Sequence, residues 1–163
     1  MNNFFIDDLI ERLETVTDSV HICEQSDVLD YINDFDYRKG CNYFPMICFE
    51  ETNDSPIKVL PAESKFLTDP EHRGTWMIGM EGDAINYIMC LKSQGDTLYI
   101  DTFEVNKELR GQGVAGNVIS VIESVAELYF KYLLASPFDT DAISFWEHMD
   151  YVEGKNGYWA KIL

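Results

Sequence analysis

The residues best suited to chemistry lie between positions 98 and 130, where a glycine-rich stretch follows an apolar one. Residues 110–115 read Arg-Gly-Gln-Gly-Val-Ala and fit the pattern Q/R-x-x-G-x-G/A. Because glycine has no Cβ, the backbone at Gly111 and Gly113 can approach a bulky ligand. A helix that begins here would point its first amides at an anion, and its dipole would favour negative charge. The pattern therefore predicts a phosphate or pyrophosphate site built from the charge of Arg110 and the amides of Gly111, Gln112, Gly113, Val114 and Ala115.

Two carboxylates precede this loop, at Asp101 and Glu104. If residues 97–105 form a strand, alternation places Asp101 on the face of Tyr99, Phe103 and Val105, and Glu104 on the opposite face with Leu98 and Ile100. Apolar neighbours would desolvate a carboxylate and favour its protonation, as a general base requires. Both are candidate bases. The alternatives are that the base lies elsewhere, that the reaction uses no base, or that each residue is an exposed or salt-bridged carboxylate.

The elements that position these groups follow from periodicity. Alternating stretches separated by short polar turns predict an antiparallel meander over residues 75–80, 84–92 and 97–105. A helix is predicted over 113–130, and then a strand over 132–138. That strand lies parallel to 97–105 because a helical crossover joins them. A helix over 141–149 and a last strand near 156–163 complete the chain.

The first half of the chain is less regular. Its apolar spacing predicts helices over 4–16 and 27–35, and strands over 19–23 and 44–51. Residues 52–74 carry three prolines and many turn residues, which predicts a long excursion with little local structure.

Two motifs in this order of elements resemble the GCN5-related N-acetyltransferase (GNAT) family. Residues 105–116, VNKELRGQGVAG, are similar to V-x-P-x-x-R-G-x-G-x-A/G, with Lys107 where proline is common. Residues 139–151 are similar to N-x-x-A-x-x-F-Y-x-x-x-G-F. The resemblance covers residues 75–163 within one domain, 1–163, whose first 74 residues diverge. It implies an α/β (α+β) fold with a mixed, mostly antiparallel sheet, helices on both faces, and a parallel strand pair splayed around an acyl-CoA.

The resemblance also implies a reaction. Acetyl-CoA would be the co-substrate, its pantetheine paired with the backbone at Phe103 and Val105, and one strand amide would polarise the thioester carbonyl. A primary amine would then attack directly. The family's base, where it sits on this strand, shares the face of the position of Val105, so Asp101 is favoured over Glu104. The acceptor is expected to be a small-molecule amine or a protein or peptide amine.

Trp146 is the main departure from the family pattern, because many members have a tyrosine there that can protonate the leaving thiolate. Tryptophan is only a weak N–H donor and cannot be that acid. Three alternatives follow. Trp146 forms one side of the thioester pocket without acting as an acid, or another residue (Tyr151 or Tyr158) is the acid, or the acetyltransferase activity is weak or absent. Asp139 replaces the family's asparagine and is expected to cap the helix that follows. A catalytically inactive acyl-CoA-binding or regulatory domain is therefore the alternative function.

Composition limits the partners. The formal net charge of −17 argues against nucleic acid and slightly favours a cationic acceptor. No apolar run is long enough to span a membrane, and the N-terminus lacks the pattern of a signal peptide. The four cysteines are interpreted as reduced thiols of a cytoplasmic protein, either a monomer or a homodimer. No metal site is expected, and the histidines are interpreted as surface or packing residues: His21, His72 and His148.

Overall fold

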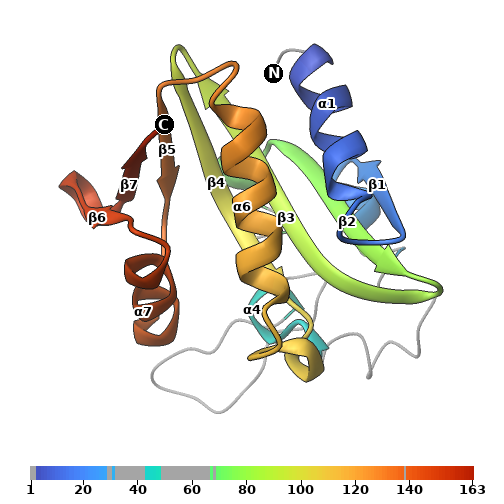
Figure 1. Cartoon of the computed structure of the whole chain (residues 1–163). Helices are drawn as coiled ribbons and strands as arrows, with labels where there is room; N and C mark the ends of the chain where they lie inside the picture. Colours follow the sequence, from blue (N-terminus) through green and yellow to red (C-terminus); the bar gives the residue numbers. More distant parts are fainter. Residues whose placement is uncertain (1–2, 29–30, 32–42, 49–66, 68, 138) are drawn as a thin grey trace.

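A computed structural model describes residues 3–28, 31, 43–48, 67, 69–137 and 139–163. Its centre is a seven-stranded sheet in the order β1-β2-β3-β4-β5-β7-β6 (Figure 1). All neighbouring strands are antiparallel except β4 and β5. The strands are β1 (Ser19–Cys23), β2 (Thr75–Glu81), β3 (Ala84–Gln94), β4 (Thr97–Val105), β5 (Tyr132–Ala135), β6 (Val152–Glu153) and β7 (Trp159–Ile162). The mixed, mostly antiparallel sheet predicted from the sequence is confirmed.

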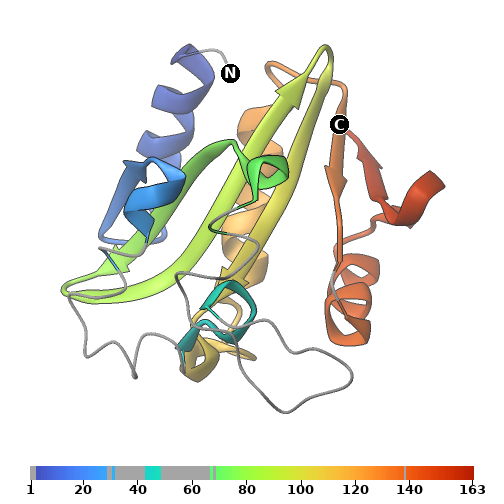
Figure 2. The same cartoon turned by 180° about the vertical axis from the view of Figure 1, so that it is seen from behind.

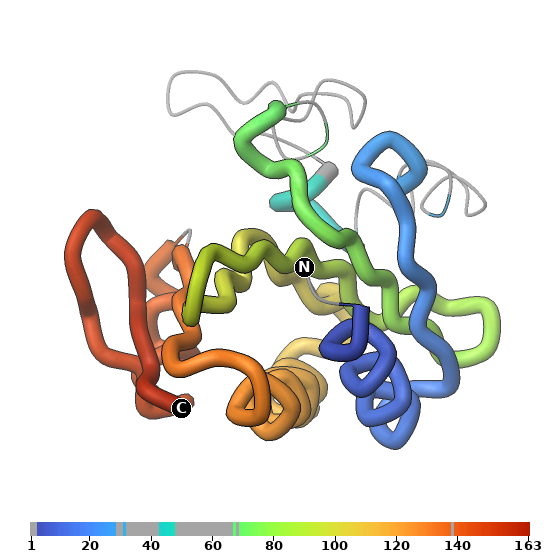
Figure 3. Tube along the Cα trace, turned by 90° about the horizontal axis from the view of Figure 1, so that it is seen from above, coloured from blue at the N-terminus to red at the C-terminus, as the bar shows by residue number. Residues whose placement is uncertain are grey.

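Two helices cover one face of this sheet, α1 (Asn3–Leu13) and α6 (Val114–Ala126), and they lie side by side in Figures 1 and 3. Both present an apolar stripe, because residues three and four apart share a helix face. Phe5 and Leu9 of α1 and Val118 and Ile122 of α6 are almost wholly buried in the main core. The second helix ends at Ala126 rather than at residue 130, and Leu128 just beyond it is 74% exposed.

The opposite face carries shorter elements: the 3₁₀ turns η1 (Gln25–Asp27) and η3 (Pro70–His72), and helix α4 (Pro45–Cys48) (Figure 2). A second apolar cluster, which includes Phe44, Ile47, Trp76 and Ile88, fills this side. The predicted strand over 44–51 is wrong where the structure describes it, because residues 45–48 are helical. Proline is favoured at the first position of a helix. The strand was predicted from its apolar residues alone, and that pattern does not include the preference of proline. Most of the predicted helix over 27–35 and of the excursion over 52–74 lies outside the described residues.

A β-bulge interrupts the pairing of β3 with β4. Cys90 pairs with Thr102 and Leu91 with Ile100, so Asp101 is an extra residue that faces no partner of its own. An extra residue reverses the alternation of side chains beyond it. Phe103 and Val105 therefore join Ile100 on the α6 face, and Glu104 lies on the other face.

The predicted placement of Asp101 beside Phe103 and Val105 is therefore wrong. Asp101 contacts His72 and Lys92, on the side of the sheet where Glu104 also lies. Strict alternation along 97–105 missed the bulge, because no residue type in this strand marks it.

The last part of the chain builds the sheet edge beyond β4. β5 runs parallel to β4, as predicted, and helix α7 (Thr140–His148) follows it. The predicted cap is confirmed, since Asp139 Oδ1 accepts a hydrogen bond of 2.8 Å from the amide of Ala142. β7 then pairs with β5, and the short β6, which was not predicted, pairs with β7. No helix in the described part of the chain has the length and apolarity needed to cross a membrane.

Candidate active site

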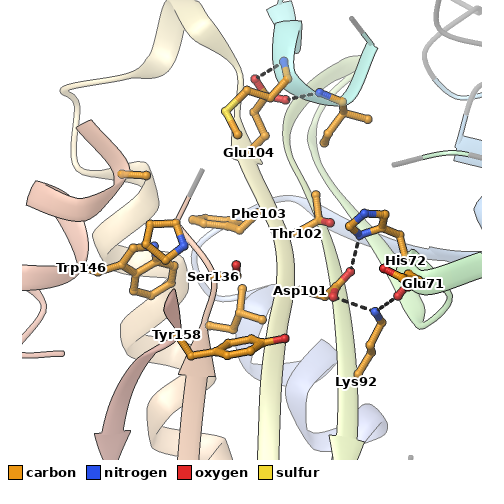
Figure 4. Close-up of a pocket in the computed structure, with 15 residues that line it drawn as sticks. Glu71, His72, Lys92, Asp101, Thr102, Phe103, Glu104, Ser136, Trp146 and Tyr158 are labelled. Carbon is orange, nitrogen blue, oxygen red and sulfur yellow. Dashed lines mark hydrogen bonds and ion pairs between the residues drawn. The ribbon is translucent and has the colours of Figure 1, made fainter. Parts of the chain in front are cut away.

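A pocket opens where β4 and β5 separate (Figure 4). The two strands pair from Thr97 with Tyr132 as far as Ile100 with Ala135, and β4 then continues to Val105 paired with β3 but not with β5. The pocket there has a volume of about 370 Å³ and is lined by residues from α4, η3, β3, β4, α7 and the segments after β5 and before β7. A strand edge without a strand partner offers backbone groups to a ligand, so the separation makes both a space and a row of hydrogen-bonding groups.

Asp101 lies in this pocket between two nitrogen-bearing side chains. Its Oδ1 is 2.6 Å from Lys92 Nζ and its Oδ2 is 2.9 Å from His72 Nδ1 (Figure 4). All three side chains are about one-fifth to one-quarter exposed. The carboxylate is therefore ion-paired, instead of being surrounded by apolar side chains as the sequence analysis expected.

His72 and Lys92 are the pocket residues that sequence reasoning missed. The two-residue turn at 95–96 sets the hairpin register and places Lys92 opposite Tyr99, diagonal to Asp101. The strands predicted over 84–92 and 97–105 would instead pair Lys92 with Thr97, so the sequence did not indicate this contact. His72 had no usable signal either. It comes from a turn 29 residues before Asp101, and nothing local indicates that the two meet. His72 lines the pocket and is bonded to Asp101, a placement that its interpretation as a surface or packing residue did not include.

Glu104 also lines the pocket, but its carboxylate binds the protein itself. Oε1 accepts hydrogen bonds from the Met46 amide at 3.1 Å and from Arg110 Nη2 at 2.8 Å, and Oε2 accepts one from the Ile47 amide at 2.9 Å. The side chain is 2% exposed, and burial raises the pKa of Glu104 to about 6 in spite of these three donors. Glu104 therefore holds the start of α4 and the glycine loop against the end of β4.

Arg110 contacts the protein through part of its guanidinium, although its side chain is 45% exposed. Besides its ion pair with Glu104, its Nε donates to the Val105 carbonyl at 3.1 Å, and its amide donates to the Lys107 carbonyl at 3.4 Å. The amide of Gln112 likewise donates to the Leu109 carbonyl at 3.3 Å, and its side chain to the Glu108 carbonyl at 2.8 Å. Arg110 and Gln112 therefore help to shape the loop, and their predicted contact with a ligand stays a prediction.

Gly111 and Gly113 have φ of +76° and +84°, a left-handed conformation that other residues adopt at a cost of about 1–2 kcal/mol. A Cβ built at either position would meet no heavy atom within 4 Å. The backbone conformation, not crowding within the chain, therefore requires glycine here, and the space above the loop is open. Gly113 caps α6 without a side-chain hydrogen bond, so the first turn, which includes Val114 and Ala115, presents amides without intrahelical acceptors.

Aromatic side chains form the opposite wall of the pocket. Trp146 of α7 is 5% exposed and packs edge-on against Phe145 and Tyr151, with ring centroids 5.1 and 4.7 Å away. Tyr158 lines the pocket as well, whereas Tyr151 does not. Burial raises the pKa of Tyr151 above its ordinary value, which makes that phenol a poorer acid. Of the two tyrosines considered as acids, only Tyr158 is placed to reach the pocket.

The described residues contain no group of three or more His, Cys, Asp or Glu side chains that could hold a metal ion. Cys23 and Cys90 are free thiols, and burial raises the pKa of each to about 12. Neither thiol faces the pocket, and the side chains of Cys41 and Cys48 lie outside the described residues.

Solved structures share this fold at low sequence identity. An acetyltransferase of the GNAT family from Staphylococcus aureus Mu50 aligns over 89% of this chain and 99% of its own, with 14% identity and a TM-score of 0.53. The GNAT domain of PAT from Streptomyces lividans aligns over 89% and 91%, with 13% identity and a TM-score of 0.52. Ard1 from Thermoplasma volcanium aligns over 88% and 97%, with 15% identity and a TM-score of 0.50. In some other matches the chain covers only 61% or 62% of the other protein.

These likenesses establish the fold alone. A comparison with curated proteins gives no match. The family model described as the acetyltransferase (GNAT) family matches residues 37–151, which include the β-meander, the glycine loop, α6, β5 and α7. The chain therefore belongs to the GNAT family and is an acetyl-CoA-dependent acetyltransferase.

Proposed function

We propose that the protein transfers the acetyl group of acetyl-CoA to a primary amine by direct attack. The observation that carries the proposal is the position of the pocket, which opens where β4 loses its pairing with β5 and is lined by β4 from Ile100 to Glu104, on the strand that precedes the glycine loop. The part of β4 that lacks a β5 partner is five residues long, or roughly 16 Å. An extended pantetheine arm would pair with its backbone at Phe103 and Val105. The pyrophosphate would bind the loop at Gly111, Gly113, Val114 and Ala115.

The chemistry would take place at the pocket end of that arm. A β4 amide would polarise the thioester carbonyl, and Trp146 would wall the acetyl group. A thiolate is a good leaving group, so departure of CoA needs little help from an acid. Asp101, rather than Glu104, would take part in removing the proton of the amine, because both carboxylate oxygens of Glu104 accept hydrogen bonds from α4 and Arg110.

The acceptor in this proposal is a small-molecule amine or a protein or peptide amine, with a cationic one favoured by the charge of −17. We further propose that the protein acts in the cytoplasm, as a monomer or a homodimer.

An amine panel tests this function. The protein is incubated with acetyl-CoA and, in turn, with diamines, monoamines, amino acids and lysine-containing peptides, and both free CoA and acetylated product are measured. We expect at least one amine to gain one acetyl group for each CoA released. The competing candidate, motivated by Trp146 in place of a tyrosine, is an inactive acyl-CoA-binding domain. It is favoured if acetyl-CoA binds while no acceptor, including protein lysines, is acetylated.

A further inference from the structure

We propose that an apolar strip on the sheet beside the pocket docks a peptide segment of the acceptor, so that the acetylated amine belongs to a peptide or protein; this inference rests on the proposed function. The strip lies on β4, β5, β7 and β6, on the face of the sheet opposite α6. Its side chains are those of Tyr99, Tyr132, Leu134, Val152, Ala160 and Ile162.

The strand register places these six side chains on one face. Directly paired residues share a face of a sheet, and so do alternate residues of one strand. The pairs are Tyr99 with Leu134, Leu134 with Ala160, Val152 with Ala160, and Tyr132 with Ile162. The intervening residues lie on the other face, since Leu133 is in the main core and Lys161 Nζ is 2.9 Å from Glu123 Oε2 of α6.

The strip is open to solvent. Ile162 is 79% exposed and Val152 68%, and Tyr132 is exposed as well. None of the six side chains belongs to either apolar cluster formed by the described residues. The elements on this side of the sheet, η1, η3 and α4, do not extend over β5 and β7 (Figures 2 and 3). Single apolar residues are common on surfaces, whereas a contiguous set marks a binding surface.

The strip is continuous with the pocket. Tyr99 pairs with Lys92 and lies two residues before Asp101, and the latter two residues line the pocket on this face. The ring of Tyr99 also lies edge-on to that of Tyr158, another pocket residue, with 6.0 Å between the centroids. An acceptor whose amine lies beside Asp101 can therefore extend directly onto the strip.

The size of the strip argues against a second copy of this chain as its occupant. The strip covers three strand spacings across the sheet, roughly 14 Å, and two alternate positions along it, roughly 7 Å. Each partner in a stable interface buries roughly 800 Å², which is far more than this strip offers. Two copies would also each carry a formal charge of −17 and would repel each other.

A peptide has both the reach and the side chains that the strip requires. Tyr132 pairs with Thr97, four residues along the strand from Asp101, so it lies roughly 13 Å from the pocket. An extended peptide covers that distance in about four residues. Apolar side chains two to four residues from the acetylated amine would contact the strip, whereas a diamine or a simple monoamine has no such side chains.

The test uses three acceptors: a peptide with leucine at the second and fourth positions from its free amine, the same peptide with serine there, and a diamine. We expect wild-type kcat/KM to be about tenfold or more higher for the leucine peptide than for the serine peptide. Tyr132→Thr combined with Ile162→Thr should remove about that factor for the leucine peptide alone. Threonine favours strands, so the double variant should fold.

Ile22→Thr is the matched control. It replaces another exposed isoleucine in a strand, but β1 is at the far end of the sheet from β7. Its kcat/KM for all three acceptors should equal that of wild type. Acetylation of the diamine reports on the pocket itself, and neither Tyr132 nor Ile162 lines the pocket.

Binding of labelled peptides in the presence of CoA, followed by fluorescence polarisation, measures docking without turnover. Equal kcat/KM and equal affinity for the two peptides in wild type would overturn the inference, and so would a double variant that keeps the wild-type values. A wild-type dimer that the double variant turns into a monomer would assign the strip to a second copy and overturn it too. If wild type acetylates none of the acceptors yet binds the leucine peptide more tightly than the double variant does, the proposed function fails and the docking surface stands.

Discussion

At the scale of single residues, the bulge at Asp101 is the feature that organises the pocket. One extra residue in β4 turns Asp101 toward His72 and Lys92, and it leaves Phe103 and Val105 packed on the α6 face. The carboxylate could be predicted from the sequence as a candidate, but its partners could not. A prediction from strict alternation assumes that every residue is paired, so it misses a bulge. His72 is distant from Asp101 in the sequence, and the two meet only in the tertiary fold.

Thr102, beside the bulge, gives a prediction about stability. It is 8% exposed, and its Oγ1 is buried with no hydrogen-bond partner among the residues that the structure describes. A buried hydroxyl without a partner costs about 1–3 kcal/mol, so Thr102→Val should raise the free energy of unfolding by about 1 kcal/mol. Urea denaturation measures it, with Thr97→Val on the same strand as a control expected within about 0.5 kcal/mol of wild type. A clear loss of stability in Thr102→Val would mean that the hydroxyl has a partner.

At the scale of elements, Glu104 joins three segments that are far apart in the chain. Its carboxylate binds the first amides of α4, the guanidinium of the glycine loop and, through its own backbone, β4. The helix over Pro45–Cys48 could not be predicted because its first amides are satisfied by a side chain 57 residues later. The meander, the loop, α6, β5 and α7 could be predicted, since their periodicity, turns and caps are local.

Glu104 also makes stability depend on pH. Its pKa is raised from 4.5 to about 6, so the folded state holds the proton more tightly than the unfolded state. The resulting stabilisation is fully present below about pH 4.5 and is lost as the pH rises through 6, a change of about 2 kcal/mol. Glu104→Gln should be less stable than wild type by about 1–3 kcal/mol at pH 7, because the NH₂ group that replaces Oε2 leaves the Ile47 amide without an acceptor and the charge beside Arg110 is lost.

Urea denaturation between pH 4 and 7 checks this prediction. The difference in the free energy of unfolding between wild type and Glu104→Gln should increase by about 2 kcal/mol as the pH falls, since only the wild type gains the proton. Glu108→Gln is the same change at an exposed position in the adjoining turn. Its free energy of unfolding should equal that of wild type at each pH. A gap that stays constant or narrows toward pH 4 would show that Glu104 does not titrate in this way.

At the scale of the whole molecule, the charge of −17 should act on the rate of encounter. An acidic protein attracts cations over roughly 10 Å at about 0.1 M salt, and added salt screens that attraction. We expect kcat/KM for a diamine to exceed that for an ω-amino acid of equal length, and the ratio to fall several-fold between about 0.02 and 0.5 M salt. Steady-state kinetics at the two salt concentrations measure it. A ratio that does not change with salt would mean that pocket contacts alone select the acceptor.

The most direct measurement concerns the glycine loop, because the proposed reaction requires acetyl-CoA to be held there. Calorimetric titration of acetyl-CoA should show one site per chain in wild type, and Gly113→Glu should weaken binding a hundredfold or more by placing a carboxylate where the pyrophosphate binds. Gly95→Glu is the matched control. Gly95 also has a positive φ, +56°, and open space above it, but it lies in the β3–β4 turn. We expect Gly95→Glu to bind as wild type; equal affinity in wild type and Gly113→Glu would contradict the placement of acetyl-CoA on this loop.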